Sequence, residues 1–270
     1  MINKVIKFVG NPKKYFRRGA QQAQQRLCWI FKDSSFFMQL QMDISPKSLW
    51  HRRDFAAATG GFFPTMMDSS IDREIVPLEP WDNTRRDMLV LLLRTVVVEK
   101  IEGDIAELGV YRGNTAKLFH YYLPERELHL FDTFQGFTNR GSTAELTATG
   151  DTVNALHFAD TSIEAVKDYI CQKNNRIHFY SGYFPETVPE NLNLRRFAFV
   201  HLDADLYQPT LDGLRYFYPR MSNNGMIVVH DYNAWPGARQ AVEHFLQDKA
   251  EIAIPMPDKS GSALIVRSIT

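Results

Sequence analysis

The sequence predicts an α/β protein built on a doubly wound, mostly parallel sheet of seven strands that ends in an antiparallel hairpin. Short runs of β-forming residues alternate with segments long enough for a crossover helix between residues 82 and 250. That alternation is typical of parallel strands with helices on both faces of the sheet. The last two apolar runs are instead joined by a short turn, and strands joined in this way must be antiparallel.

The regular pattern begins at residue 82. Asp82-Asn83-Thr84 supplies polar capping residues for a helix that continues through an apolar stretch to Glu99. Asn114 or Thr115 is expected to cap the helix after the first strand. Parallel strands are predicted at 104–110, 127–131, 176–180, 197–202 and 226–230, followed by a helix at 237–247 and hairpin strands at 251–255 and 263–267.

The composition is that of an ordinary globular enzyme, with 44% hydrophobic and 23% charged residues. Lys+Arg and Asp+Glu are both 31, so the chain has no net field that would attract nucleic acid. Cys28 and Cys171 have no metal-binding or disulfide spacing. The longest apolar run, residues 88–98, is too short to span a bilayer and contains Arg94, so we expect a cytoplasmic protein.

The first 80 residues differ from the rest. Residues 1–32 carry eight Lys and Arg and no acidic residue. Two interpretations stay open: peripheral contact with the inner face of a membrane, or a solvated basic tail. Residues 33–80 are aromatic-rich and loop-like and suit a lid. We therefore divide the chain into a basic arm with a lid-like segment, residues 1–80, and an α/β domain, residues 81–270.

Ligands of open α/β sheets bind beyond the carboxyl ends of the strands. The first predicted strand ends in Glu107-Leu-Gly109-Val-Tyr111-Arg-Gly113, where glycines allow close approach of the backbone. This run lacks the Gly-x-Gly-x-x-Gly pattern that holds a pyrophosphate, which disfavours a nicotinamide or flavin cofactor. A carboxylate such as Glu107 suits the cationic amino acid end of a sulfonium cofactor.

The next two strand ends fit a nucleoside. Asp132, in the run Phe131-Asp132-Thr133, lies about 20 residues beyond the glycine turn, where a carboxylate can accept both ribose hydroxyl hydrogens. The alternative is a surface aspartate that caps a loop. Gly182 and Tyr183 follow the third strand and combine a small residue with an aromatic ring, which suits the wall of an adenine pocket.

Several motifs in the same order resemble the macrocin O-methyltransferase family, which methylates sugar hydroxyls of antibiotics. They are Glu-Leu-Gly-Val-Tyr-Arg-Gly, Phe-Asp-Thr-Phe-Gln-Gly-Phe, Ser-Gly-Tyr-Phe-Pro-Glu-Thr-Val-Pro, His-Leu-Asp-Ala-Asp-Leu-Tyr-Gln-Pro-Thr and His-Asp-Tyr…Pro-Gly…Ala-Val, and the match covers roughly residues 82 to 250. The resemblance implies a class I methyltransferase domain, Rossmann-like, over residues 81–270, and S-adenosylmethionine as cofactor. It implies cofactor contacts from Glu107, Gly109, Asp132 and Gly182, to which we add Tyr111, Gly113, Thr133 and Tyr183 from the same motifs. It also implies a divalent cation, usually magnesium, beside the methyl donor.

The run His201-Leu-Asp203-Ala-Asp205 lies at the end of the fourth predicted strand, and His230-Asp231 lies at the end of the fifth. Strand alternation would put Asp203 and Asp205 on the same side. Converging carboxylates repel one another unless they are protonated or bridged by a cation. We predict a site for Mg²⁺, with Mn²⁺ as the alternative, formed by Asp203, His230 and Asp231. A hydrogen-bonded acidic pair that caps the following helices, near Thr210 and Pro236, is the interpretation that needs no ion.

Methyl transfer is an in-line displacement with an activated leaving group, so the enzyme must mainly align the acceptor and remove its proton. We predict Asp203 and His230 as the catalytic residues, with histidine favoured as proton acceptor at neutral pH. The family pattern has two consecutive acidic residues before the tyrosine, whereas this chain has His230-Asp231-Tyr232. Histidine is a poorer ligand for magnesium than for manganese, iron or zinc, so the preferred metal is open.

The predicted function is methylation of a hydroxyl on a sugar, glycan or related metabolite, assisted by a divalent cation. The expected partners are S-adenosylmethionine and a small-molecule or glycan acceptor, without nucleic acid; homo-oligomer formation stays open. Two other classes are alternatives: a nucleotide- or NAD-dependent enzyme on a similar sheet, and a non-catalytic module docked on a membrane.

Overall fold

The computed structural model describes residues 83–154, 157–170 and 175–268. The predicted basic arm and lid-like segment, residues 1–80, lie outside the described residues. No helix in the described ranges is both long enough and apolar enough to cross a lipid bilayer.

A sheet of seven strands forms the centre, in the order β3-β2-β1-β4-β5-β7-β6. The first five strands are parallel, and β7 runs antiparallel to both β5 and β6. The predicted α/β class and the C-terminal antiparallel pair are thus confirmed. The strands are β1 (Asp104–Leu108), β2 (Leu128–Asp132), β3 (Ile177–Ser181), β4 (Phe197–Leu202), β5 (Met221–Val229), β6 (Ile254–Pro255) and β7 (Ala263–Val266).

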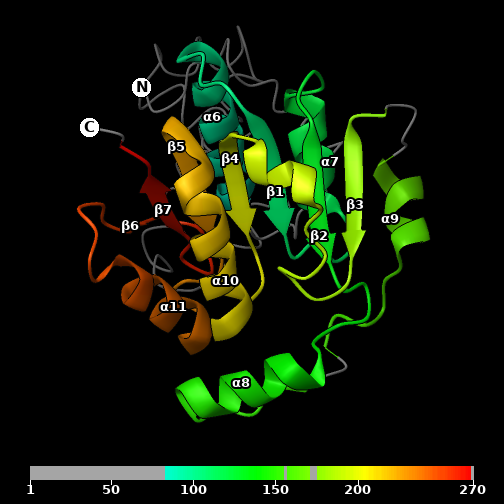
Figure 1. Ribbon diagram of the computed structural model, residues 1–270, viewed down its shortest axis with the longest axis vertical. Coiled ribbons are helices and arrows are strands. Elements are labelled where there is room, and N and C mark those ends of the chain that lie inside the picture. The colour runs from blue at the N-terminus through cyan, green and yellow to red at the C-terminus, as the bar shows by residue number, and fades with distance from the viewer. Residues whose placement is uncertain (1–82, 155–156, 171–174, 269–270) are drawn as a thin grey trace, which may run out of the picture. The chain divides into compact units, whose positions relative to one another are not determined.

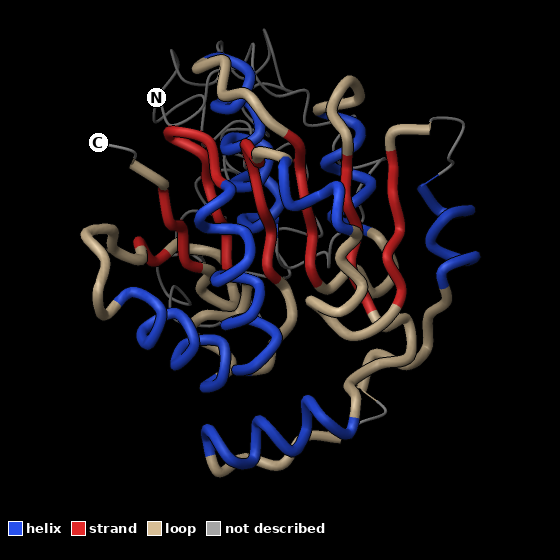
Figure 2. Tube along the Cα trace, in the orientation of Figure 1, coloured by secondary structure: helices blue, strands red, loops and turns tan. Residues whose placement is uncertain are grey.

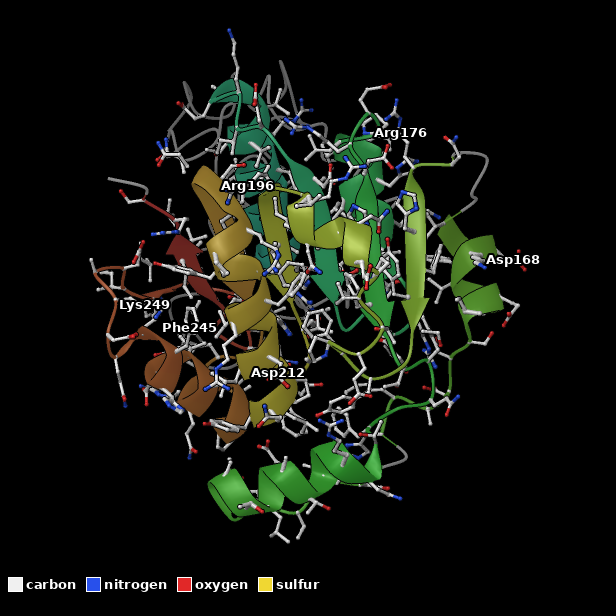
Figure 3. The ribbon with its side chains drawn as sticks, in the orientation of Figure 1. Asp168, Arg176, Arg196, Asp212, Phe245 and Lys249 are labelled. Carbon is white, nitrogen blue, oxygen red and sulfur yellow. The ribbon has the colours of Figure 1, made fainter. Side chains whose placement is uncertain are left out.

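Helices cover both faces of the sheet (Figure 1). The first core cluster joins one face to α6, α7 and α9, and the second joins the other face to α10 and α11. The helices are α6 (Asn83–Val98), α7 (Asn114–Tyr122), α8 (Asn139–Thr149), α9 (Ile163–Ile170), α10 (Tyr207–Phe217) and α11 (Pro236–Leu246), with short 3-10 turns η1 (Glu190–Leu194) and η2 (Tyr218–Arg220). Charged side chains such as Asp168 and Arg196 lie on the outside of these layers (Figure 3).

The central strands are apolar along most of their length because helices cover both of their faces. Every residue of β1 and of β4 is buried, as expected for strands in the middle of a parallel sheet. The chain leaves β1 towards β3 and then returns to β4 on the other side of β1. The strand order therefore reverses between β1 and β4, and that switch point opens a crevice at the carboxyl ends of these strands.

Three local expectations need correction. The helix α7 is preceded by Gly113 in a left-handed conformation (φ 80°) without a side-chain cap, so neither Asn114 nor Thr115 caps it. The hydroxyl of Thr115 is instead bonded to a buried carboxylate, Glu107. The strand β5 begins at Met221, before the predicted 226–230 run. The polar helix α8 was not predicted, and it stands away from the sheet (Figure 2).

The C-terminal end of the sheet is tied down by a charged cluster. Arg267, just after β7, donates to Glu251 Oε1 at 2.7 Å and to the Tyr218 hydroxyl at 3.1 Å. Burial opposes ionisation of Glu251, but hydrogen bonds from Tyr218 and Arg267 outweigh it and lower the pKa of Glu251 to about 2. The carboxylate of Glu251 is thus more acidic in the folded chain than in the unfolded chain.

This shift predicts a pH-dependent contribution to stability. Because the folded pKa lies below the unfolded one, the contribution is complete above about pH 5 and is lost as the pH falls from about 4.5 towards 2. We expect Glu251→Gln to lower the free energy of unfolding by about 1–2 kcal/mol at pH 7, after allowance for partial solvent screening. Urea denaturation of the two proteins at pH 7 and pH 3 measures the difference, which should shrink at pH 3; a difference independent of pH would contradict the ionic origin.

Candidate active site

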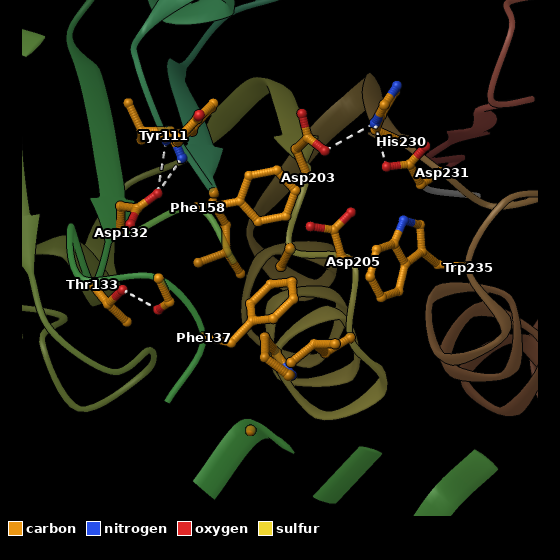
Figure 4. A pocket seen from close by; sticks show the side chains of 18 of the residues that line it. Tyr111, Asp132, Thr133, Phe137, Phe158, Asp203, Asp205, His230, Asp231 and Trp235 are labelled. Carbon is orange, nitrogen blue, oxygen red and sulfur yellow. Dashed lines mark hydrogen bonds and ion pairs between the residues drawn. The ribbon is translucent and has the colours of Figure 1, made fainter. Parts of the chain in front are cut away.

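A cavity of about 500 Å³ opens at the carboxyl ends of the parallel strands. Its wall includes residues that directly follow each of β1 to β5, together with Arg85 from α6 and residues around the start of α8 (Figure 4). The predicted site residues on this wall are Gly109, Tyr111, Asp132, Thr133, Gly182, Tyr183, Asp203, His230 and Asp231. The structure therefore brings six of the eight predicted cofactor residues and the three predicted metal ligands to one cavity; Glu107 and Gly113 are not on its wall.

Gly109 allows the tips of β1 and β4 to meet. Its φ is 88°, in the left-handed region, and a Cβ atom at this position would overlap the backbone carbonyl of Asp203. The N–H of Asp203 in turn donates to the carbonyl of Leu108 at 2.8 Å. A side chain at residue 109 would thus force apart the two strands whose ends carry the two halves of the cavity.

Asp132 organises the turn after β1. Its Oδ2 atom accepts hydrogen bonds from the N–H groups of Val110 at 2.7 Å and Tyr111 at 2.8 Å, and its Oδ1 accepts from Phe134 at 2.7 Å. A carboxylate offers about four acceptor positions, and three of these are taken by the backbone. Few acceptor positions of Asp132 are therefore left for the predicted contact to both ribose hydroxyls. The main role of Asp132 in this structure is to hold the turn that shapes the pocket.

The other predicted cofactor residues form one side of the cavity. Tyr111 has φ 48° and bonds through its hydroxyl to Asp160 at 2.7 Å. Thr133 donates to the carbonyl of Gly136 at 2.7 Å and thereby closes the turn after β2. Tyr183 carries the guanidinium of Arg140 over its ring at 4.3 Å. Gly113 is buried at the start of α7, beneath this side rather than on the wall.

Glu107 does not reach the cavity. It is fully buried in β1, where Oε1 contacts the Thr115 hydroxyl and His201 Nδ1, the latter at 3.0 Å. Burial raises the pKa of Glu107 well above its usual range and lowers the pKa of His201 to about 3. His201 is therefore uncharged near neutral pH, and burial favours the protonated form of Glu107. Glu107 lies behind the wall, so direct contact with the cofactor remains a prediction that this geometry does not favour.

The acidic cluster faces the cavity from β4 and β5. Asp203 Oδ1 lies 2.9 Å from His230 Nδ1, and Asp231 Oδ2 lies 3.0 Å from the same nitrogen. The other oxygen of Asp203 accepts from the guanidinium of Arg85 at 2.5 Å. Cationic and anionic side chains thus alternate from Arg85 through Asp203 and His230 to Asp231, and Figure 4 shows the last three.

These contacts set the charges of the cluster. Burial opposes ionisation of Asp203, but the charges of His230 and Arg85 outweigh it and hold the pKa of Asp203 well below its usual range. Burial also opposes protonation of His230, yet Asp203 and the hydrogen bonds to Asp203 and Asp231 raise its pKa to about 10. In the absence of a cation His230 is therefore protonated at neutral pH. That His230 accepts the acceptor's proton stays a prediction; it requires that the proton shared with the two carboxylates is first displaced.

Asp205 completes the cluster. The strand β4 ends at Leu202, so strand alternation does not govern this residue; it reaches the same cavity as Asp203 through a left-handed backbone, φ 57°. Burial raises the pKa of Asp205 well above its usual range, and the neighbouring charge of Asp203 and a hydrogen bond to Asp231 add to the rise. The interpretation of an acidic pair that caps α10 and α11 is not supported, since Leu206 and Trp235 occupy the cap positions without a side-chain cap bond.

The donor set fits a small divalent cation. Asp203, His230 and Asp231 each offer one ligand atom, and these atoms lie within 4.8 Å of one another. Two carboxylate oxygens and one imidazole nitrogen suit manganese and, less well, magnesium. A bound ion would have to compete with the proton on His230 and with the guanidinium of Arg85.

Sequence reasoning missed two parts of the site. The rings of Phe137, Phe158 and Trp235 line the same cavity as the carboxylates, with Phe137 at 5.4 Å from Phe158 and 6.0 Å from Trp235 between ring centroids (Figure 4). Phe137 ends the second quoted motif and Trp235 falls in the gap of the last one, but their rings meet only in the fold. The position of Arg85 in the sequence could have indicated its role. A cation in the first turn of a helix is unfavourable for the helix dipole, which indicates that the side chain is kept for a contact outside the helix.

The strand order, the antiparallel end of the sheet and the cavity beyond the strand ends together define a class I methyltransferase, Rossmann-like in its parallel half. The profile of the macrocin O-methyltransferase family matches residues 80–265. The chain belongs to this family and is an S-adenosylmethionine-dependent O-methyltransferase. The alternatives of an NAD-dependent enzyme and a non-catalytic module are thereby set aside.

Individual relatives of the chain are also named as methyltransferases. The chain is 25% identical over 235 residues to a demethyldecarbamoylnovobiocin O-methyltransferase of Streptomyces niveus, over 79% of this chain and 86% of the relative. It is 26% identical over 195 residues to a rhamnosyl-tetracenomycin-C 4'-O-methyltransferase of Streptomyces olivaceus, over 68% and 72% of the two chains. The structure of the O-methyltransferase NovP superposes with a TM-score of 0.58 at 25% identity, over 69% of this chain and 80% of that one. The calicheamicin methyltransferase CalS11 shares the fold, with a TM-score of 0.57 at 20% identity over 91% of each chain.

The role of Asp132 in shaping the cofactor pocket can be measured. Asp132→Asn replaces one carboxylate oxygen by an amide nitrogen, which cannot accept the backbone hydrogen bonds that order the turn. We expect the affinity for S-adenosylhomocysteine, measured by calorimetry, to fall about tenfold or more, the equivalent of about 1.4 kcal/mol. Asp151→Asn, a change at an exposed carboxylate, is the control. Wild-type affinity in Asp132→Asn would show that the turn does not depend on this side chain.

Proposed function

We propose that this protein transfers the methyl group of S-adenosylmethionine to a hydroxyl of a sugar or a related natural-product acceptor, with a divalent cation beside that hydroxyl. The observation that carries the proposal is the position of Asp203, His230 and Asp231: three ligand atoms within 4.8 Å of one another, on the wall of the cavity formed by the strand ends. An acceptor oxygen bound there would lie next to the donor pocket.

The relatives support a glycosylated acceptor. One relative is named for methylation of a rhamnosyl-tetracenomycin at the 4' oxygen, and another, from Micromonospora griseorubida, for methylation of mycinamicin III at the 3'' oxygen. The aromatic rings of Phe137, Phe158 and Trp235 suit the apolar face of a sugar or an attached ring system, while the carboxylates of the same cavity suit its hydroxyls.

The chain's own residues would align the acceptor and accept its proton. Asp203 offers a carboxylate oxygen to the cavity and is the proposed proton acceptor, together with His230 once its proton is displaced. Arg85 holds Asp203 in place through its guanidinium. A divalent cation, when bound by Asp203, His230 and Asp231, would supply Lewis acidity that stabilises the developing alkoxide.

The cation half of the proposal is tested by binding. We expect Mn²⁺ and Mg²⁺ to bind the wild-type protein in calorimetry, and Asp231→Asn and His230→Ala to weaken Mn²⁺ binding about tenfold or more, since each removes one ligand. Both variants should bind S-adenosylhomocysteine within about threefold of wild type, because the cofactor side is untouched. Asp168→Asn, on the outer side of α9 (Figure 3), is the matched control. Absence of cation binding, or unchanged binding in both variants, would refute this half.

The acceptor half is tested by labelling. The protein is incubated with methyl-labelled S-adenosylmethionine and a panel of free sugars, nucleotide sugars and glycosylated natural products, and products are identified by mass spectrometry. We expect label on a sugar hydroxyl, and Trp235→Ala should raise the acceptor KM about tenfold through loss of ring contact while cofactor affinity stays unchanged. Label found only on nitrogen or on acceptors without a sugar would contradict the proposal.

A further inference from the structure

The helix α8 cannot be held by ordinary hydrophobic packing. Its sequence is mostly polar, its apolar side chains are two alanines and the exposed Leu146, and its buried residues are Gly141 and Glu145. It nevertheless packs against α10 and α11, away from the sheet (Figure 1). A helix without an apolar stripe needs another source of tertiary stability.

That source is one carboxylate. Glu145 is only 1% exposed. Its Oε2 accepts the N–H of Tyr207, the first residue of α10, at 2.6 Å, and it also accepts the N–H of Gly237, in the first turn of α11. Neither helix has a side-chain cap of its own from the residue that precedes it. Glu145 therefore supplies in trans the hydrogen-bond acceptor that two helix N-termini require.

The packing around this carboxylate is close. A Cβ atom on Gly237 would overlap both carboxylate oxygens of Glu145. Gly141, one turn earlier in α8, lies where a Cβ would come within 3.2 Å of Leu206. The absence of side chains at these two positions is what lets α8 approach the starts of α10 and α11.

The two capped helices are continuous with the acidic cluster. Asp203 and Asp205 lie in the turn that leads into α10, and Asp231 lies in the turn that leads into α11. The start of α8 contributes Thr138 and Gly141 to the cavity wall, and Phe137 precedes it. One carboxylate thus connects the aromatic side of the cavity to both turns that carry the proposed metal ligands.

We propose that Glu145 is a positioning residue of the acceptor pocket: by capping α10 and α11 together, it fixes α8 and the two acidic turns as a single wall. This inference rests on the proposed function for the identity of the pocket. The positions of α8 and the two turns can be tested without any acceptor.

The test is a double-mutant cycle between Glu145 and Gly237, read by hydrogen–deuterium exchange. Glu145→Ala should speed amide exchange in residues 139–149 about tenfold or more, the equivalent of about 1.4 kcal/mol, while peptides from β1 and β2 stay unchanged. Gly237→Ala should do the same, because the new methyl group displaces the carboxylate. In the Glu145→Ala background Gly237→Ala should have no further effect or a slightly protective one, since alanine favours a helix.

Three further measurements separate positioning from general damage. Glu145→Gln keeps one acceptor oxygen and should show intermediate exchange. Glu186→Gln breaks an exposed ion pair to Arg140 of α8 and should behave as wild type. With an acceptor from the labelling panel, Glu145→Ala should raise KM more than it lowers kcat, and all variants should bind S-adenosylhomocysteine within about threefold of wild type.

Wild-type exchange of α8 in Glu145→Ala, or additive effects of the two single changes, would overturn the inference. If Glu145→Ala does not fold, Gly237→Ala and Glu145→Gln carry the same comparison. A wild-type protein that fails to bind S-adenosylhomocysteine would count against the proposed function and leave the exchange result standing.

Discussion

The close approach of Gly109 to the backbone of Asp203 is the contact on which the site depends. The strand order reverses between β1 and β4, so the chain connections leave β1 and β4 on opposite sides. A crevice in which a ligand can bind forms between their carboxyl ends. Because residue 109 has no side chain, the turn that forms the cofactor pocket lies directly against the turn that carries the acidic cluster. A methyl donor and a hydroxyl acceptor can meet only if these two turns are neighbours, and this contact makes them so.

Charge balance is the second constraint, and internal side chains meet it. The carboxylates of Asp203 and Asp231 are held by the imidazole of His230, and Asp203 also by the guanidinium of Arg85. One layer deeper, burial raises the pKa of Glu107 and keeps His201 uncharged. A cation that binds this site therefore replaces charges that are already present rather than filling an empty anionic hole. Its affinity depends on how readily the proton of His230 and the guanidinium of Arg85 are displaced.

The acceptor side of the cavity is stabilised by a different kind of interaction from the core. The sheet and its covering helices are stabilised by two continuous apolar clusters. The helix α8 has almost no apolar contribution and depends on the hydrogen bonds of Glu145 at two helix ends. Charge-assisted bonds of this kind are directional, so they fix position more narrowly than apolar contact does. A cavity wall held by such hydrogen bonds can present a defined surface to an acceptor without burying further apolar residues.

Sequence alone determined the fold class and the places where chemistry is carried. Short apolar runs predict the strands, and a glycine after Leu108 and aspartates after Phe131 and Leu202 mark their ends. Only the tertiary structure decided that the oxygens of Asp132 accept backbone N–H groups, that Glu107 lies behind the wall and that His230 carries a proton. It also decided that Arg85 contacts Asp203 and that Glu145 contacts the start of α10. The reason is physical: a hydrogen bond or a pKa depends on distances between residues as far apart in the chain as Arg85 and Asp203, and only folding creates those distances.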